Sequence, residues 1–342
     1  MGLYATRVIL FSILFAIETS AMAAADQVVV YTSVDDVFAR PIAEQFTKET
    51  GIDVLLVPDT EETKSTGLLN RMIAEKNRPQ ADVFWSGDPV RAAVLKLKGI
   101  AEQYQSPNAR KLPKAYSDPD GYWTGFSARV RVILYNTEQI TKDQAPTSIF
   151  DLVNRPELHG KSCIANPLFG TTSMQAAALF IALGDKGGRD YFEGLTRNGL
   201  KMVSSNGEVR RRVAEGDCAV GFVDSDDAYE AVKDKKPVGV VYPDENGIGT
   251  LIIPNATVLI ANARHPNNAK KFIDYLLTRQ TEQALAESDA AQLPLLPDVT
   301  TPPQMRTIDK LHPMQVEYGK LALKLDELSR GYLREWAAKN NR

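Results

Sequence analysis

The stretch VVVYTSVDDVFARPIAEQFTKETGIDVLLVP (residues 28–58) contains a strand, a helix and a second strand in immediate succession. VVVYTS is a continuous apolar run rich in β-branched residues, as expected of a strand that is buried on both faces. Apolar residues then recur at helical spacing between Val37 and Phe46, and a glycine ends this segment. Pro41 must kink that helix or mark a late start. IDVLLVP is the second predicted strand.

The same alternation continues along the chain. STGLLNRMIAEK (65–76) is a predicted helix, ADVFWSG (81–87) a strand and VRAAVLKLKG (90–99) a helix. Farther on, RVRVILYNT (129–137) and IIPNATVLIANA (252–263) are long extended runs. Strands and helices that alternate at short intervals are typical of an α/β fold, with a parallel sheet covered by helices. Two such regions joined by two long extended segments predict a bilobed protein with a cleft.

Further helices are predicted in the second half of the chain. SMQAAALFIALG (173–184) and NNAKKFIDYLLTRQTEQALAE (267–287) carry apolar residues at helical spacing, and the C-terminal third from residue 302 is predicted to be helical and amphipathic. Cys163 and Cys218 both lie in strand-like runs. They could form a disulfide if those strands are neighbours, or remain two buried thiols, because one pair has no spacing signature.

Bulk composition limits the function. The 342 residues are 44% hydrophobic and 24% charged, which is ordinary for a globular protein of about two domains. A net charge of −3 argues against a nucleic-acid partner. Arg7, the apolar run VILFSILFAI and the small residues of ETSAMAAADQ predict a signal peptide over 1–25, cleaved near Ala23 to Ala25. No cysteine lies there, so we expect an exported, periplasmic protein without a lipid anchor.

Polar segments follow several predicted strands. They are YTS (31–33), WSGD (85–88), NPLFGTTS (166–173) and VDSDD (223–227). In open parallel sheets, ligands bind beyond the carboxyl ends of the strands, so these segments should line the cleft. The aspartates of VDSDD could hold a cationic group or a metal. Alternatively they only cap the following helix and place acidic residues in its first turn.

Several stretches together resemble the periplasmic solute-binding proteins of ABC importers, in the ferric-ion-binding branch. They are VVVYTSVDDVFARPIAEQFTKETGIDV, ADVFWSGDPVRAAVLKLKGIAEQY, TSIFDLVNRPELHGK, GTTSMQAAALF, GDCAVGFVDSDDAYEAV, and ATVLIANARHPNNAKKFIDYLLTRQTEQAL with LPLLPDV behind it. The resemblance implies a type II periplasmic binding protein fold, with two lobes, a two-strand hinge and a ligand cleft that closes between them. It also implies an inner-membrane ABC importer permease as partner, and a monomer. We expect the first lobe to comprise residues 26–130 plus 262–342 and the second lobe residues 131–261.

The resemblance also assigns positions in the site. The histidine that the iron-binding relatives use falls on Asp35, or on Asp36 with a one-residue shift, and their glutamate falls near Gly87, beside Asp88. Their paired tyrosines fall on Asp226 and Asp227. Phenolate oxygens select ferric iron, whereas carboxylates suit calcium or magnesium at least as well. These departures argue against ferric iron as the ligand.

The resemblance further assigns an anion site to the loop Gly170-Thr171-Thr172-Ser173 and to Arg129. Glycine lets the backbone approach an anion, hydroxyls donate hydrogen bonds, and a helix N-terminus favours negative charge. The alternative for this loop is a plain Ser/Thr helix cap.

We therefore predict that the protein binds a small ligand bearing a phosphate or phosphonate group. Donors on one side of the cleft and carboxylates on the other fit a zwitterion such as 2-aminoethylphosphonate, or a sugar phosphate. Ferric iron or another cation with a synergistic anion is the alternative. A secreted metal-dependent phosphatase is a remote one, since GxSxG, HExxH and P-loop motifs are absent. We predict no enzymatic activity, no cofactor and no resident metal. The predicted ligand-binding residues are Ser33, Asp35, Ser86, Asp88, Arg129, Gly170, Thr171, Thr172, Ser173, Asp224, Asp226 and Asp227.

Overall fold

The computed structural model describes residues 26–59 and 67–341. The predicted signal peptide (1–25) and the first two residues of the helix predicted at 65–76 lie outside the described residues. The strands are β1 (Gln27–Thr32), β2 (Asp53–Pro58), β3 (Val83–Ser86), β4 (Ala101–Glu102), β5 (Thr124–Asn136), β6 (Ser162–Ala165), β7 (Lys201–Val203), β8 (Val220–Asp224), β9 (Val238–Val241) and β10 (Ile252–Ile260).

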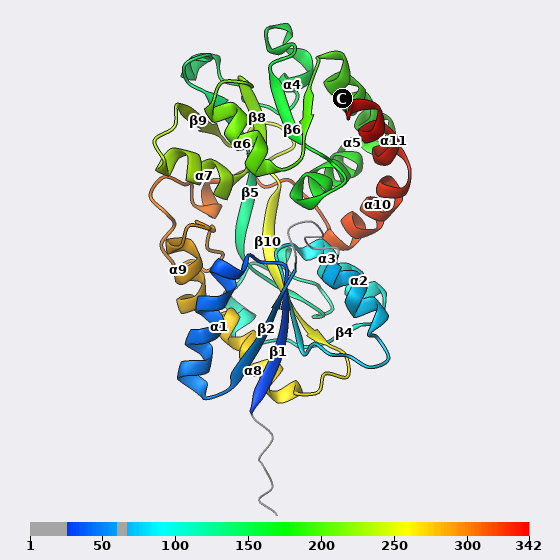
Figure 1. The fold of residues 1–342 in the computed structure, drawn as a ribbon, viewed down its shortest axis with the longest axis vertical. Coiled ribbons are helices and arrows are strands. Elements are labelled where there is room, and N and C mark those ends of the chain that lie inside the picture. Colours follow the sequence, from blue (N-terminus) through cyan, green and yellow to red (C-terminus); the bar gives the residue numbers. More distant parts are fainter. Residues whose placement is uncertain (1–25, 60–66, 342) are drawn as a thin grey trace, which may run out of the picture.

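Helices cover these strands on both faces (Figure 1). They are α1 (Asp36–Thr50), α2 (Gly67–Ala74), α3 (Pro89–Leu97), α4 (Asp151–Asn154), α5 (Gly170–Arg197), α6 (Asn206–Ala214), α7 (Ser225–Lys233), α8 (Pro266–Leu276), α9 (Arg279–Glu287), α10 (Tyr318–Arg330) and α11 (Tyr332–Asn340). Short 3-10 turns are η1 (Pro107–Lys111), η2 (Lys114–Tyr116), η3 (Lys142–Gln144), η4 (Pro156–Leu158) and η5 (Ile308–Lys310).

The strands pair in the order β2-β1-β3-β10-β5-β8-β6-β7, with β4 beside β10 and β9 beside β5. Strands β2, β1 and β3 are parallel to one another, as are β8, β6 and β7. The long strands β5 and β10 are antiparallel to their neighbours. The prediction of parallel strands in the two alternating regions is therefore confirmed, and the two long extended segments predicted to join these regions form the antiparallel strands β5 and β10.

Two bodies of helices and strands are joined by β5 and β10, which run between the lower and upper halves of Figure 1. The first part of β5, up to Val130, pairs with β10, and from Arg131 onward the strand pairs with β8. The predicted two-lobe α/β fold with a two-strand hinge is confirmed. The lobe boundaries stay a prediction, because α10 packs against both α3 and α5, and α11 packs against β7.

Several helix predictions need correction. The segment 267–287 forms two helices, α8 and α9, because the side chain of Thr278 accepts a hydrogen bond from Thr281 N and caps a new helix. Residues 302–317 are not α-helical, and the C-terminal helices start only at Tyr318. Helix α1 runs through Pro41, whereas α5 breaks at Gly184, where φ is 71°.

Two further features are a disulfide and the lengths of the helices. Cys163 in β6 and Cys218 just before β8 form a disulfide, with their Cα atoms 6.1 Å apart, which settles the alternative left open above. Among the helices of the described residues, none is both long and apolar enough to span a membrane.

Candidate functional site

Arg129 lies in β5, just before this strand changes partners. Its Nη2 donates to the carbonyl oxygen of Gly87 at 2.5 Å, in the loop that follows β3. Its Nη1 lies 3.7 Å from Asp224 Oδ2 and 3.9 Å from Asp226 Oδ2, at the junction of β8 and α7. The guanidinium therefore joins segments of both halves of the molecule, and about 20% of the side chain remains exposed.

Four carboxylates surround this guanidinium. Burial alone would lower the pKa of Arg129, but Asp226, Asp224, Asp88 and Asp35 together raise it. Asp224 and Asp226 come from VDSDD, Asp88 comes from WSGD, and Asp35 lies two residues after YTS. The structure thus brings both the lobe-1 and the lobe-2 candidates to one cation.

Arg131, two residues farther along β5, is fully buried. Its Nη1 donates to Asp224 Oδ1 at 2.7 Å and to Thr171 Oγ1 at 3.2 Å. Its Nη2 donates to the Phe222 carbonyl at 3.2 Å and to Thr172 Oγ1 at 3.4 Å. Arg131 therefore ties the start of α5 to the end of β8 inside the second half.

Asp224 is the carboxylate that this frame holds. Besides Arg131, it accepts from the Thr171 hydroxyl at 2.6 Å and from Asn206 Nδ2 at 3.3 Å, both on Oδ2. Burial would raise the pKa of Asp224, but Arg131, Arg129 and the Thr171 hydroxyl hold it below its usual range. Asp224 occupies the N-cap position of α7 without making a side-chain cap hydrogen bond within the described part of the chain. The interpretation of this aspartate as a simple helix cap is therefore wrong.

Asp226 and Asp227 lie in the first turn of α7 and differ from Asp224 in their electrostatics. Burial, reinforced by Asp224 and opposed by Arg129, raises the pKa of Asp226 to about 6. Burial, with Asp226 and Asp224 nearby, raises the pKa of Asp227 well above its usual range. Carboxylate oxygens of these three aspartates lie within 4.8 Å of one another, a spacing that could hold a cation. Arg129 lies 3.9 Å from Asp226, a longer contact than the 2.7 Å between Arg131 and Asp224.

The N-terminus of α5 lies beside this cluster. Thr171, Thr172 and Ser173 are buried in the first turn, and Gly170 is exposed with φ 53°. Within the described residues, Phe169 at the N-cap makes no side-chain cap hydrogen bond. First-turn N–H groups have no intrahelical partner, so this helix start can accept an anion. The four predicted residues are thus part of the helix itself rather than a cap before it.

The first-half candidates serve mainly to shape the loop around Gly87. Ser33 Oγ accepts from Gly87 N at 2.9 Å, and Ser86 Oγ accepts from Asp88 N at 3.3 Å. Asp88 Oδ1 caps α3, accepting from Val90 N at 2.9 Å and from Arg91 N at 3.1 Å. Asp35 stands at the N-cap position of α1.

Sequence reasoning missed two polar residues of this site, Arg131 and Asn206. Asn206 Nδ2 donates to Thr171 Oγ1 at 3.0 Å, and its Oδ1 accepts from Thr172 at 3.2 Å. A signal for Arg131 was present, because residues two apart in a strand share a face and Arg129 was already a candidate. Nothing in the sequence singles out Asn206, whose contacts depend on how α6 packs beside β8.

Three aromatic residues near the predicted site have different surroundings. Tyr31 is buried and donates its hydroxyl to Glu75 at 3.1 Å, and Trp85 is fully buried against Phe126 with ring centroids 5.9 Å apart. Phe169, in contrast, is 60% exposed beside the start of α5. Only Phe169 is available to contact a bound molecule.

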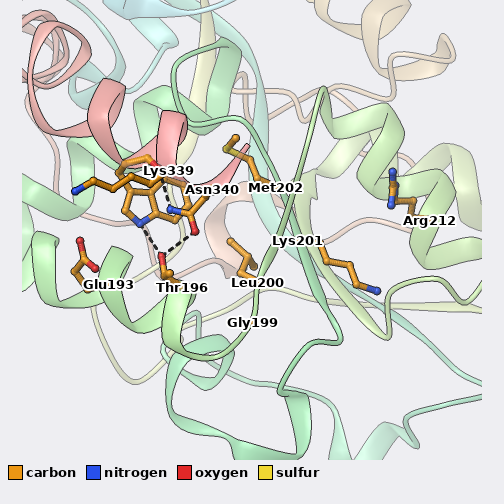
Figure 2. A pocket seen from close by; sticks show the side chains of 10 residues that line it. Glu193, Thr196, Gly199, Leu200, Lys201, Met202, Arg212, Lys339 and Asn340 are labelled. Carbon is orange, nitrogen blue, oxygen red and sulfur yellow. Dashed lines mark hydrogen bonds between the residues drawn. The ribbon is translucent and has the colours of Figure 1, made fainter. Parts of the chain in front are cut away.

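A separate cavity of about 660 Å³ lies between α5, β7 and α11 (Figure 2). Lys201, Arg212 and Trp336 are among its lining residues. The Trp336 Nε1 donates to Thr196 Oγ1 at 3.0 Å, so this indole is already bonded. Among the described residues, none of the predicted ligand-binding residues lines this cavity. We place the candidate site at Arg129, because the predicted carboxylates gather around its guanidinium.

Comparison with known proteins supports this view of the fold. Residues 78–316 match the family described as bacterial extracellular solute-binding protein. The probable ABC transporter periplasmic-binding protein y4fP of Sinorhizobium fredii is 27% identical over 333 residues, which cover 91% of this chain and 89% of that protein.

Two solved structures are similar as well. Iron-bound HitA from Pseudomonas aeruginosa has a TM-score of 0.79 at 22% identity, covering 89% of this chain and 98% of that chain. The periplasmic binding protein AfuA from Actinobacillus pleuropneumoniae, with exogenous fructose-6-phosphate bound, has a TM-score of 0.77 at 24% identity, covering 90% and 98%. The family match spans most of the described chain, and these likenesses confirm the type II periplasmic binding protein fold. The chain therefore belongs to the bacterial extracellular solute-binding protein family and is the periplasmic solute-binding component of an ABC importer rather than an enzyme.

Proposed function

We propose that the protein captures a small molecule that carries a phosphate or phosphonate group together with an amino group or hydroxyls. 2-Aminoethylphosphonate and a sugar phosphate are the two examples that fit. The observation that carries this proposal is the position of Arg129 beside Asp224 and Asp226, where Asp224 also accepts a hydrogen bond from Thr171 at the start of α5. Donors for an anion and acceptors for a cation or hydroxyl thus meet at one partly exposed guanidinium.

The acidic side of the site favours a ligand that brings a positive charge or hydrogen-bond donors. Asp224 is already satisfied by Arg131 and Thr171. Asp226 and Asp227 have raised pKa values because they are buried close to other carboxylates. An ammonium group would supply the opposite charge that they lack, and hydroxyls would supply donors to their oxygens.

The basic side favours an anion. Arg129 is charged, and the start of α5 presents N–H groups next to the exposed Gly170. A phosphate bound there would also reach the hydroxyls of Thr171 and Thr172. The fructose-6-phosphate that AfuA holds on the same fold supports a phosphate-bearing ligand.

A cation with a synergistic anion is a second candidate. It is favoured by the spacing of Asp224, Asp226 and Asp227, whose oxygens lie within 4.8 Å of one another, and by the iron that HitA binds. All three ligand groups would be carboxylates, which suit a divalent cation at least as well as ferric iron.

Isothermal titration calorimetry of the mature protein separates these candidates. The ligands are 2-aminoethylphosphonate, a hexose phosphate, inorganic phosphate, ferric citrate and Ca²⁺. We expect tight binding of an organophosphorus compound and weak binding of either metal. Tight binding of ferric iron without binding of the organophosphorus compounds would overturn the proposal.

Two variants test the proposed division of the site. Asp226→Asn and Asp227→Asn should abolish binding of 2-aminoethylphosphonate and leave inorganic phosphate almost unaffected, because only the aminated ligand needs their charge. An equal loss for both ligands would indicate a structural role for these aspartates. Glu335→Gln, at an exposed glutamate in the first turn of α11, is the matched control.

We further propose that the protein reaches the periplasm through cleavage near Ala23 to Ala25, carries no lipid anchor, and delivers its ligand as a monomer to an inner-membrane permease. The mass of the mature protein purified from the periplasm tests the cleavage site. A mass that includes residues 1–22, or an added lipid, would contradict it.

A further inference from the structure

The hinge strand β5 has an unusual backbone at Ser127. Its φ of 37° lies in the left-handed region that residues other than glycine rarely adopt. At the same place the pairing of β5 with β10 shifts register, between Pro254 and Asn255. Arg129 follows only two residues later, so the conformation of Ser127 directs the strand that carries the guanidinium.

Glu282, from α9, holds this backbone from one side. The carboxylate is fully buried and accepts hydrogen bonds from Ser127 N at 2.6 Å and from Leu296 N at 2.7 Å. It also accepts from Leu295 N at 3.1 Å. Three backbone amides thus converge on one carboxylate, and one of them belongs to a residue two positions before Arg129.

Asn255 holds the same point from the other hinge strand. Its Nδ2 donates to the Ser127 carbonyl at 2.7 Å and to Gln292 Oε1 at 2.6 Å. Ala128 exchanges two backbone hydrogen bonds with Leu293, each of 2.7 Å. Ser127 is therefore bonded through its N–H to Glu282 and through its carbonyl to Asn255, and both residues are buried.

We propose that Glu282 is a positioning residue of the hinge. Together with Asn255 it fixes the backbone of Ser127 as the pivot of β5, and so sets the angle between the two halves and the place of Arg129. Glu282 binds Ser127 N, at the place where the register of β5 and β10 shifts. A carboxylate that only stabilised the fold would not need to bind at that place. The first part of this proposal concerns the hinge alone, and only the place of Arg129 rests on the proposed function.

Distances between the halves test the hinge without any ligand. Spin labels are attached at Lys48→Cys in α1 and Lys186→Cys in α5, two exposed positions on different halves (Figure 1). Glu282→Gln replaces one accepting oxygen by a donor that faces backbone N–H groups. We expect it to widen the interlobe distance distribution of the ligand-free protein and to shift its centre.

Asp244→Asn is the matched control. Asp244 is also a buried carboxylate whose pKa is raised by burial, and its side chain accepts from Ser148 and from Ile149 N rather than from residues of β5 or β10. We expect it to lower the melting temperature, as Glu282→Gln does, without changing the distance distribution. An unchanged distribution in Glu282→Gln, or the same change in Asp244→Asn, overturns the proposal.

Asn255→Ala keeps the test decisive if Glu282→Gln does not fold. It removes the amide that donates to the Ser127 carbonyl and leaves the hydrogen bond from Ser127 N to Glu282 in place, so we expect it to widen the interlobe distance distribution as well. An unchanged distance distribution in Asn255→Ala overturns the proposal by itself.

The link to Arg129 is tested by titrating 2-aminoethylphosphonate into the same variants. If the competent arrangement falls to about one tenth of the population, the apparent Kd rises about tenfold. A distance change without a loss of affinity would refute only the part that concerns Arg129. Absence of binding in the wild-type protein would instead count against the proposed function.

Discussion

Asp226→Asn should stabilise the ligand-free protein above about pH 6. Burial raises the pKa of Asp226 to about 6, so the folded state holds its proton more tightly than the unfolded chain does. The stabilisation that this raised pKa provides is complete below about pH 4 and is lost as the pH rises through about 6. Asparagine has no charge to bury and therefore avoids that loss.

The size of the effect follows from the shift. A rise from 3.8 to about 6 corresponds to about 3 kcal/mol at pH 8, and it already includes the attraction of Arg129. Two corrections reduce it: 26% of the side chain is exposed, and the substitution removes a negative charge from the first turn of α7, worth about 0.3–1 kcal/mol. We expect a net gain of about 1–2 kcal/mol, or roughly 2–4 °C in Tm.

Differential scanning calorimetry of dialysed protein between pH 4.5 and pH 8 measures this gain. The difference between Asp226→Asn and the wild type should be small at pH 4.5 and grow through pH 6. Asp36→Asn, in the first turn of α1, controls for the loss of a charge at a helix start and should give no comparable rise. A gain that is independent of pH, or a lower Tm for Asp226→Asn at pH 8, would refute the reasoning.

Three further predictions concern stability. Replacing Cys163 and Cys218 by serine opens a loop of 55 residues and should lower the free energy of unfolding by about 4 kcal/mol. Denaturant unfolding measures this loss, and a midpoint equal to that of the wild type would contradict it. Arg131→Met should cost about 3–5 kcal/mol, because it leaves Asp224 buried without its cation; near-neutral stability in urea titrations would show that the pair is dispensable. Phe169→Ser introduces a capping hydroxyl at the start of α5 and should raise the free energy of unfolding by about 0.5–1 kcal/mol, unless another group already caps this helix.

Much of the fold was predictable because buried strands leave unbroken apolar runs. VVVYTS is such a run and forms β1, whereas IDVLLVP is equally apolar but forms β2 at the edge of the sheet, where its residues are exposed or half-buried. Helix ends were harder to predict, since 267–287 looks continuous until the side chain of Thr278 is seen to cap a second helix. That break also starts the helix that delivers Glu282 to the hinge, a contact between residues 155 positions apart that no local pattern encodes.

The site was predictable only as far as topology determines it. Segments at the carboxyl ends of parallel strands lie at one edge of a sheet, which is why WSGD and VDSDD were expected to line one cleft. Arg129 lies inside β5 and was assigned only from the family resemblance. Whether an acid caps a helix or faces the ligand depends on its individual hydrogen-bond partners, which strand order does not determine. Asp88 is followed by proline at the first helical position, a combination typical of a helix cap, and the structure uses it as one.

The three aspartates of VDSDD show where sequence reasoning stops. No sequence pattern distinguishes them, but Asp224 is the last residue of β8 and accepts a hydrogen bond from the buried Arg131, whereas Asp226 and Asp227 lie in the first turn of α7. Asp224 therefore has a lowered pKa, and burial raises the pKa of Asp226 and Asp227 even though Arg129 lies 3.9 Å from Asp226. Loss of binding in Asp224→Asn would then report a broken frame around Arg131. Only substitutions of Asp226 or Asp227 test the chemistry of the ligand.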